Sequence, residues 1–221
     1  MITVVITSFN RLDLLKIAIS SFNRFNTFPI KEFIIIDDSG NEEFHKEIRK
    51  LYPSYTLILN KSNIGLVESI DKAYALVTTP YVFHSEDDYE YYRPGFIERS
   101  LVVLENDPKI MQVWLRDLTD TAGLSVEPKI LRSGNIEYHL MGDCKDNWWH
   151  GFCFQCGLRK MSAYDRIKPF TKWSSPSEFI TSRECKIGQA YYKLGYRAAI
   201  LLQGYARHIG QKRSTFGLLN T

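Results

Sequence analysis

The first half of the chain alternates between short β-branched runs and segments in which apolar residues recur at helical spacing. Residues 2–7 form an unbroken run rich in Val and Ile, which is typical of a strand buried on both faces of a parallel sheet. Leu12, Leu15, Ile19 and Phe22 then fall on one face of a helix. This alternation predicts an α/β domain whose mostly parallel central sheet is flanked by helices.

The same pattern continues to residue 115. We expect further strands at 33–36, 55–59, 81–84 and 110–115, and helices at 42–50, 66–77 and 94–106, with Pro94 in the first helical turn. Over residues 116–150 the pattern loosens. It resumes with a predicted strand at 151–156, a helix at 182–194, a strand at 197–201 and a basic tail. No linker or internal repeat divides the chain, so we expect a single domain over residues 1–221.

The charge balance excludes several classes of partner. The chain has 221 residues and a formal net charge of +3, from 28 basic and 25 acidic side chains. So mild a balance argues against a nucleic-acid footprint or a charged membrane patch. No stretch approaches the ~20 apolar residues of a membrane span, and the N-terminus lacks signal-peptide features. We therefore expect a soluble, cytoplasmic protein with no integral membrane segment.

The cysteines do not predict a disulfide framework. Cys153 and Cys156 form a CxxC pair within the predicted strand at 151–156, which would point them to opposite faces. A closed zinc site needs four converging ligands, so a site that adds Cys144 or His150 is disfavoured. Reduced, structural cysteines are expected, and they suggest an intracellular setting.

Polar side chains follow three of the predicted strands. The segments are 7–11 (Thr-Ser-Phe-Asn-Arg), 37–39 (Asp-Asp-Ser) and 85–88 (Ser-Glu-Asp-Asp). Ligands of a parallel α/β sheet bind at the carboxyl ends of its strands, so the coincidence favours a site over three unrelated turns. Taken singly, each segment is also compatible with ordinary turn chemistry.

The most specific of these segments is Glu86, Asp87 and Asp88. Three successive carboxylates repel one another unless a cation or water compensates them. After a buried strand they suit a hard divalent cation, Mn²⁺ or Mg²⁺, which leaves positions for the oxygens of a diphosphate leaving group. The alternative is an acidic cap ahead of a helix, because carboxylates also favour helix N-termini.

Four segments together resemble the family 2 glycosyltransferases, which have the GT-A fold. Residues 4–11 are similar to the opening strand and loop of that family, residues 34–40 to its second strand, and residues 60–66 (Asn-Lys-Ser-Asn-Ile-Gly-Leu) to a later loop. The acidic residues 86–88 stand where the family has its DxD metal motif. The resemblance covers residues 1–115 well and 151–210 more weakly, and leaves 116–150 unmatched.

The resemblance implies a Rossmann-like GT-A domain in which residues 1–115 bind a nucleotide sugar and residues 116–221 bind the acceptor. Asp37 is expected to accept hydrogen bonds from the base. Asp88 is the implied principal metal ligand, and Glu86 is expected to face the metal or the donor ribose. The implied nucleotide-binding residues are Thr7, Phe9, Arg11, Asp37, Asp38, Asn63, Gly65 and Asp87.

Two departures from the family pattern affect these expectations. Glu86 stands in place of the first Asp of the metal motif, which makes that side chain longer. Ile70 and Asp71 replace the Arg-Asn that often follows the loop, so some donor contacts are expected to differ.

On the acceptor side, the resemblance implies a general base at the start of a late helix. Counting back from Leu194, the matching position is Glu184. Its carboxylate would remove the proton of the acceptor hydroxyl. The alternative role for Glu184 is a first-turn carboxylate favoured by the helix dipole, and the rival bases are Asp143, Asp146 and Glu178.

The remaining candidates come from the tail and from an aromatic cluster. His208 resembles the closing histidine of the family and is expected to complete the metal shell, while Lys212 or Arg213 would neutralise phosphate. Trp148, Trp149 and His150 are candidates for the floor of the acceptor or donor-sugar pocket. A buried hydrophobic pair is the alternative for the two tryptophans.

The implied activity is metal-dependent, inverting transfer of a sugar from a nucleotide diphosphate to a hydroxyl of a glycan, a protein-linked sugar or another acceptor. UDP is the first choice of nucleotide, with GDP and dTDP open. A sugar-phosphate nucleotidyltransferase is the rival enzyme, but residues 8–11 lack the glycines of its phosphate loop. The other alternative is a catalytically lapsed nucleotide- or glycan-binding module, against which the carboxylates at 86–88 argue.

Overall fold

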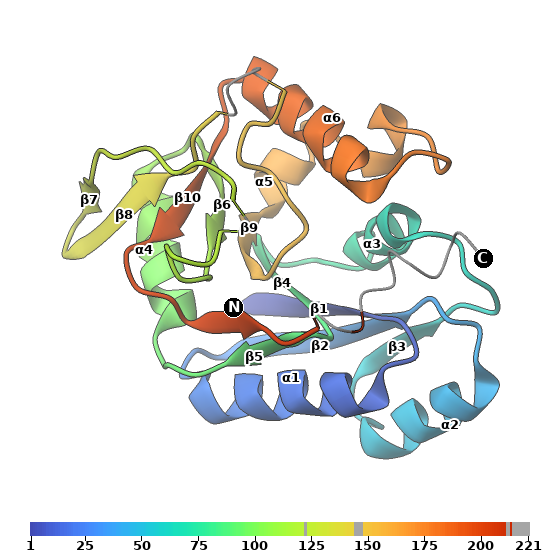
Figure 1. Ribbon diagram of the computed structural model, residues 1–221. Coiled ribbons are helices and arrows are strands. Elements are labelled where there is room, and N and C mark those ends of the chain that lie inside the picture. The colour runs from blue at the N-terminus through green and yellow to red at the C-terminus, as the bar shows by residue number, and fades with distance from the viewer. Residues whose placement is uncertain (122, 144–147, 211–212, 214–221) are drawn as a thin grey trace.

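The structure is a computed structural model that describes residues 1–121, 123–143, 148–210 and 213. Its central feature is one large sheet with helices on both faces (Figure 1). The nine strands lie in the order β3 (Thr56–Leu59), β2 (Ile30–Asp37), β1 (Ile2–Ser8), β4 (Tyr81–Glu86), β9 (Gly157–Lys160), β6 (Ile110–Trp114), β10 (Arg197–Leu201), β8 (Ile136–Leu140) and β7 (Leu131–Ser133). Two further strands, β5 (Tyr89–Tyr91) and β11 (Ala206–His208), pair with each other.

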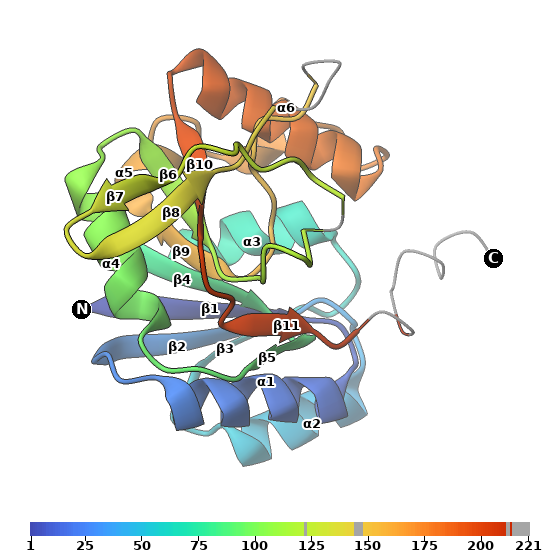
Figure 2. The same ribbon diagram turned by 60° about the vertical axis from the view of Figure 1, so that its left-hand side comes forward.

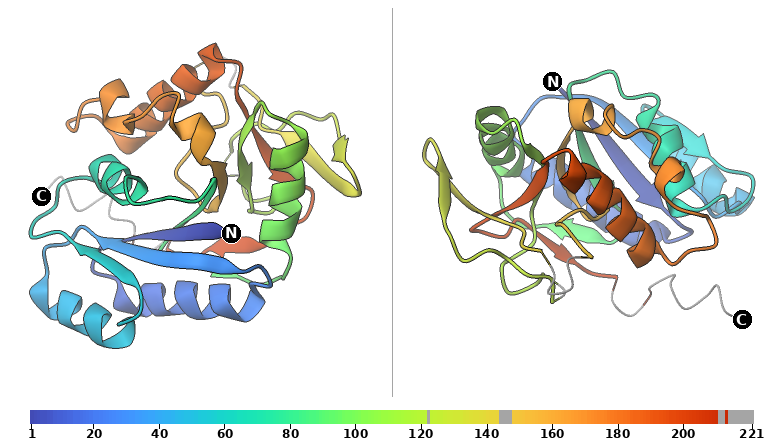
Figure 3. Two further views of the ribbon diagram at one scale, coloured as in Figure 1. Left: turned by 180° about the vertical axis from the view of Figure 1, so that it is seen from behind. Right: turned by 90° about the horizontal axis from the view of Figure 1, so that it is seen from above.

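The helices form a layer on each face of the sheet. One face is covered by α1 (Leu12–Phe25), α2 (Glu42–Leu51) and α4 (Phe96–Asn106). The other carries α3 (Leu66–Tyr74), α5 (Met161–Tyr164), the 3₁₀ helix η1 (Phe170–Trp173) and α6 (Ile180–Lys193) (Figure 3). Among the described residues, no helix is long and apolar enough to cross a membrane.

β1 shows why there are two core layers. Its side chains alternate between the faces of the sheet, so Val4 packs in the same cluster as Phe22 of α1. Val5 packs on the opposite face, in the same cluster as Ile70 of α3. The β-branched run is therefore a central strand covered on both sides, as its composition predicts.

The strand directions confirm the predicted, mostly parallel sheet. β3, β2, β1 and β4 are mutually parallel, and β10 runs parallel to β6. β9 breaks the pattern, because it lies antiparallel between β4 and β6. Gly157 opens β9 at a point of close backbone approach, where a Cβ would collide with the carbonyl oxygen of Val113.

Several predicted boundaries are wrong. Residues 151–156, predicted as a strand, are irregular, and the strand begins at Gly157. The helix predicted from Pro94 begins at Phe96, after Gly95 takes a left-handed φ of 87°. The prediction also missed the short strands β5, β7, β8 and β11, which carry no long apolar run.

Asp71 ties α3 to the segment that precedes α6. Its carboxylate accepts hydrogen bonds from the Tyr164 hydroxyl at 2.8 Å and from the backbone N–H groups of Phe170 and Thr171, each at 2.9 Å. With three donors on one carboxylate, Asp71 anchors η1 against α3.

Asp71→Ala should lower the free energy of unfolding by about 3 kcal/mol, because three donors lose a charged acceptor. Urea denaturation measures the change. The matched control is Asp165→Ala, which removes a surface ion pair with Lys168 and should change stability by less than about 0.5 kcal/mol. Equally small effects of the two substitutions would contradict the anchoring role.

Candidate active site

Three strand ends meet at one edge of the large sheet. In the pairing of β1 with β2, Ser8 lies opposite Asp37. In the pairing of β1 with β4, Thr7 lies opposite Glu86. The parallel register therefore gathers the polar segments that follow these strands, as the sequence pattern predicts.

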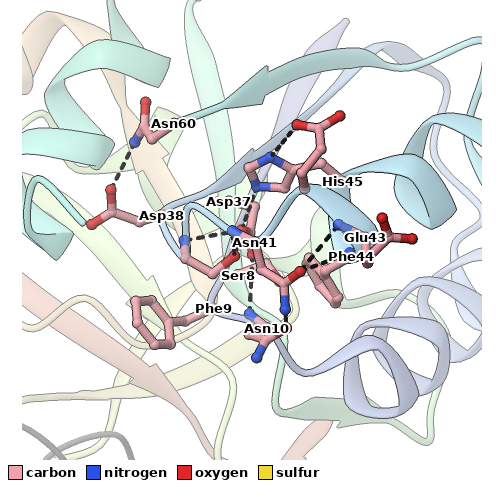
Figure 4. Close-up of polar contacts among 12 residues, drawn as sticks. Ser8, Phe9, Asn10, Asp37, Asp38, Asn41, Glu43, Phe44, His45 and Asn60 are labelled. Atoms are coloured by element: carbon pink, nitrogen blue, oxygen red, sulfur yellow. Dashed lines mark hydrogen bonds and ion pairs between the residues drawn. The ribbon is translucent and has the colours of Figure 1, made fainter. Parts of the chain in front are cut away.

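Asp37, at the end of β2, holds the surrounding loops together. Its carboxylate accepts hydrogen bonds from the N–H and hydroxyl of Ser39 and from the N–H of Asn10 at 3.2 Å, and it lies 2.9 Å from Nε2 of His45 (Figure 4). The residue is completely buried. Both carboxylate oxygens of Asp37 therefore have partners inside the protein, and its expected contact with a nucleotide base stays a prediction.

Asp38 shapes the loop that the sequence places near the nucleotide. Its Oδ1 accepts hydrogen bonds from the Asn60 amide at 2.8 Å and the Ile64 N–H at 2.9 Å, and its Oδ2 accepts the Gly65 N–H at 2.8 Å. Gly65 has a φ of 105°, which favours glycine. Exposed Asn63 also accepts a hydrogen bond from Gly65 N–H, at 2.9 Å. The nucleotide roles of Asp38, Asn63 and Gly65 stay predictions.

Thr7 and Phe9 have different environments at the end of β1. Thr7 is buried, and its hydroxyl lies 3.5 Å from the carbonyl oxygen of Ser85. Phe9 is half-buried, and its ring extends away from the hydrogen-bonded network around Asp37 (Figure 4). Phe9 thus offers an apolar ring at the strand end, whereas Thr7 contacts the neighbouring strand.

Arg11 binds two of the three successive carboxylates. Its guanidinium contacts both oxygens of Asp87 and donates from Nη1 to Oδ2 of Asp88 at 2.8 Å. Asp87 is completely buried and also accepts the N–H of Phe9 at 3.2 Å. Burial raises the pKa of Asp87 to about 6, although Arg11 acts in the opposite direction. Arg11 is therefore the internal counter-ion of this acidic turn.

The C-terminal strand brings His208 to Asp88. β11 lies antiparallel beside β5, which puts His208 opposite Tyr89 (Figure 2). The N–H of Ile209 donates to the carbonyl oxygen of Asp88 at 2.8 Å, and Nε2 of His208 lies 3.3 Å from Oδ2 of Asp88. Two predicted metal ligands that are far apart in the sequence are therefore neighbours.

Asp88 and His208 fit a divalent cation. Oδ1 of Asp88 is buried and, within the described part of the chain, has no hydrogen-bond partner. Carboxylate oxygen and imidazole nitrogen are both ligands for such ions. Residues 1–121, 123–143, 148–210 and 213 contain no group of three or more His, Cys, Asp or Glu side chains suited to a metal. With two protein ligands, the remaining coordination positions of the cation would be available to water and a diphosphate.

Glu86 ends β4. Burial raises the pKa of Glu86 well above its ordinary value, and the charges of Asp88, Glu184 and Asp87 raise it further, whereas the charge of Arg11 acts to lower it. Glu86 therefore interacts with carboxylates from both the acidic turn and α6. Its role toward metal or ribose stays a prediction.

Glu184 lies in the second turn of α6. Its Oε1 accepts a hydrogen bond from the backbone N–H of Phe154 at 2.6 Å. Burial raises the pKa of Glu184 to about 7, while the Phe154 hydrogen bond and the charge of Arg159 act in the opposite direction. A carboxyl group with such a pKa can exchange a proton near neutral pH.

A buried ion pair docks the start of α6 on α3. Arg183 donates from its two terminal nitrogens to Glu68 at 3.1 and 2.6 Å, and from Nε to the Ser174 hydroxyl at 2.9 Å. Arg183 directly precedes Glu184, so the pair constrains the helix turn that carries the candidate base. Sequence reasoning missed this contact because its partners are 115 residues apart and neither belongs to a recognised motif.

The aromatic cluster at 148–150 does not form one continuous pocket floor. Trp149 is 2% exposed and packs edge-on against the tryptophan of β6. The ring of His150 stacks on Tyr192 at 3.8 Å, and its Nδ1 lies 2.8 Å from Oδ1 of Asp143. These contacts put Trp149 and His150 in the packing of the core, which corrects their expected pocket role. Trp148 is 44% exposed, and its role stays a prediction.

The rival bases and the basic tail are engaged elsewhere or lie outside the described residues. Asp143 is paired with His150, and Glu178 with Lys186. Arg213, expected near phosphate, pairs with Asp13 of α1. Three residues named in the predictions, Cys144, Asp146 and Lys212, lie outside the described part of the chain.

The two cysteines of the CxxC pair are buried and unbonded to each other. Burial raises the pKa of the Cys153 and Cys156 thiols well above their ordinary value. Such thiols remain protonated at neutral pH, which supports the expected structural role rather than a zinc site.

Comparison with solved structures defines the class of the fold. Mannosyltransferase PcManGT from Pyrobaculum calidifontis, in complex with GDP-Man and Mn²⁺, has a TM-score of 0.61 and 15% identity over 90% of this chain and 56% of that one. GalNAc-T7, with UDP, GalNAc and Mn²⁺, has a TM-score of 0.68 and 11% identity over 93% and 42% of the two chains. The chain thus spans about half the length of these structures, and the fold is GT-A.

The sequence comparisons then define the family. The model of glycosyl transferase family 2 matches residues 3–168, so the chain belongs to that family. No curated protein matches it in sequence. Family membership confirms the resemblance carried by the strand ends and removes the support for a nucleotidyltransferase.

Arg11→Met should lower the free energy of unfolding by about 3 kcal/mol at neutral pH, because it leaves completely buried Asp87 without its counter-ion. Chemical denaturation without metal measures the loss. Arg213→Met is the control, since its ion pair with Asp13 is exposed and screened by solvent and should contribute far less to stability. A loss at Arg11 no larger than that at Arg213 would show that the buried fork is not stabilising.

Proposed function

We propose that this chain catalyses the metal-dependent transfer of a sugar from a nucleotide diphosphate to an acceptor hydroxyl, with inversion at the anomeric carbon. The observation that carries the proposal is that two chemically different carboxyl groups act on one sheet edge. Asp88 lies beside His208, whereas Glu184 has a pKa of about 7. The charges of both raise the pKa of Glu86, which ends β4 at that edge.

The donor side is supported by the loops after β1, β2 and β3. The half-buried ring of Phe9 suits stacking on a base or ribose, and the loop held by Asp38 presents exposed Asn63. Arg11 supplies a cation beside Asp87 and Asp88 where the diphosphate would lie. UDP is the first nucleotide to test. GDP follows, because PcManGT holds GDP-Man and GalNAc-T7 holds UDP.

Asp88 and His208 are the residues proposed to hold the metal, with Glu86 as a further oxygen ligand in reach of the acidic turn. Mn²⁺ is the first choice, because both solved neighbours contain it, and Mg²⁺ the second. When bound, such an ion neutralises the diphosphate and stabilises it as a leaving group.

Glu184 is the proposed general base. Its carboxylate takes the proton of the acceptor hydroxyl while the acceptor oxygen forms its bond to the anomeric carbon. The bond from that carbon to the diphosphate oxygen breaks on the opposite side, so the configuration inverts. The proton ends on Glu184 and the electron pair on the nucleotide diphosphate.

We also propose that residues 1–221 act as one domain. β10 of the back half extends the large sheet beside β6, and β11 pairs with β5 of the front half. The acceptor is proposed to be a hydroxyl of a glycan, a protein-linked sugar or a related molecule.

Glu184→Gln should reduce sugar transfer by at least about 100-fold and leave Mn²⁺-dependent UDP binding unchanged, because the amide cannot accept the proton. Asp88→Asn should weaken Mn²⁺-dependent UDP binding. Nucleotide-sugar turnover and calorimetric titration with UDP measure the two effects. Wild-type transfer by Glu184→Gln would eliminate this base assignment. Failure of UDP, GDP and dTDP to raise the melting temperature with Mn²⁺ would count against the whole proposal.

The rate should depend on pH through Glu184. Below its pKa of about 7 the carboxyl group is protonated and cannot accept the acceptor proton, so kcat/KM should fall about tenfold per pH unit. Above that pH the carboxylate dominates and the rate should level off. A profile of kcat/KM between pH 5 and 9 checks the sign. A rate that rises as the pH falls would contradict a basic role for Glu184.

A further inference from the structure

The peptide group between Cys153 and Phe154 is bound at both of its polar atoms. Its N–H donates to Oε1 of Glu184 at 2.6 Å. Its carbonyl oxygen, which belongs to Cys153, accepts hydrogen bonds from Nη2 of Arg159 and from Nε2 of Gln112, each at 2.9 Å. One planar peptide therefore lies between a guanidinium and the proposed base.

Arg159 also binds the backbone carbonyl two residues further along the chain. The same Nη2 donates to the carbonyl oxygen of Gln155 at 3.0 Å. The guanidinium thus holds the carbonyl groups on both sides of Phe154. These hydrogen bonds lie within residues 151–156, which form neither helix nor strand. The direction of the Phe154 N–H is therefore not set by the hydrogen bonds of a regular element.

The Arg159 side chain is buried, and its hydrogen bonds to the two backbone carbonyls are not ion pairs. It is 4% exposed, lies near the rings of Phe152 and Phe154 at 5.6 and 5.7 Å, and donates Nη1 to the Tyr74 hydroxyl at 2.8 Å. All of these partners are neutral. Burial of a cation is unfavourable unless charge or hydrogen bonds compensate it. The charge of Arg159 acts on Glu184, whose pKa it lowers against the larger effect of burial.

The geometry of a peptide explains how these two side chains are coupled. The peptide group is planar, and in its trans form the C=O and N–H point in opposite directions. A donor that fixes the carbonyl oxygen therefore fixes the direction of the N–H. Chains of hydrogen bonds also polarise one another, so a guanidinium on the oxygen strengthens the N–H as a donor to a carboxylate.

We propose that Arg159 is a positioning residue for sugar transfer, which orients Glu184 through the Cys153–Phe154 peptide. This inference rests on the proposed role of Glu184 as the base. Arginine suits the task because its planar fork donates to two acceptors in a fixed geometry, whereas a lysine ammonium is a compact point charge. Gln112, which lies in β6, is the second donor to the Cys153 carbonyl and limits the rotation of that peptide group.

The test compares Arg159→Met and Arg159→Lys in nucleotide-sugar turnover, measured as release of UDP from the donor with Mn²⁺. Arg159→Met should reduce kcat by about 100-fold, in the range expected for loss of a correctly placed base. The KM for the donor and the affinity for UDP with Mn²⁺ should change by less than about threefold, because Arg159 contacts none of the proposed donor residues. Arg159→Lys should recover part of kcat.

Lys160→Met is the matched control. Lys160 is the next residue of β9, is also a buried cation, and donates to a backbone carbonyl, that of Asp107 at 2.7 Å. Its loss should reduce stability but keep kcat within about threefold of wild type. Equal losses of kcat in the Lys160 and Arg159 variants would overturn the proposal, because a general effect on β9 would then explain both. Wild-type kcat in Arg159→Met would overturn it as well.

A second measurement does not depend on turnover. In protein labelled with ¹⁵N-phenylalanine, the Phe154 amide proton should resonate far downfield, because it forms a short hydrogen bond to a carboxylate. The proton should move upfield in Glu184→Gln, in Arg159→Met and, less far, in Arg159→Lys. An unchanged shift in both Arg159 variants would overturn the proposal. If instead Glu184→Gln transfers sugar like wild type while the Arg159 variants show the expected shifts, the base assignment fails and the peptide linkage stands.

Discussion

The ion pair between Arg11 and the acidic turn after β4 is the interaction on which the site depends. Parallel pairing with β1 forces the turn that holds Asp87 and Asp88 to lie against the loop that starts at Ser8. Asp87 is completely buried there, and without a counter-ion it would have to take up a proton or unfold the turn. Arg11 comes from that loop and forms ion pairs with both Asp87 and Asp88. It contacts only Oδ2 of Asp88, so Oδ1 has no partner among the described residues.

Carboxylates elsewhere in the molecule, two of them buried and one half-buried, organise the backbone. Asp37, Asp38 and Asp71 each accept hydrogen bonds from backbone N–H groups of loops that have no regular partners. Glu184 also accepts a backbone N–H, that of Phe154, and burial raises its pKa to about 7. Each of the three aspartates accepts at least three hydrogen bonds, whereas Glu184 accepts one, from Phe154 N–H. This difference separates loop anchors from the proposed base.

Much of the front half could be predicted because its signals are local. The apolar run of β1 and the spacing of Leu15 and Phe22 in α1 are each sufficient to identify an element. The back half was harder, since β9 is four residues long and runs antiparallel between two strands that are distant in sequence. The expected pocket role of Trp149 was wrong for a similar reason, because a tryptophan beside a polar loop gives no local sign that it will pack on β6.

The sequence by itself determined the α/β alternation, the family and the set of strand ends that carry Arg11, Asp38 and Asp88, because each depends on residues within a few positions of one another. Only the tertiary structure decided which of these groups form hydrogen bonds or ion pairs within the protein and which keep an atom without such a partner among the described residues. Asp37 accepts hydrogen bonds from neighbouring loops, and the β5–β11 pairing places His208 beside Asp88. Arg159 is linked to Glu184 by hydrogen bonds to the two ends of the Cys153–Phe154 peptide group. These relations join residues far apart in the chain, and their geometry is set by packing, which no local pattern encodes.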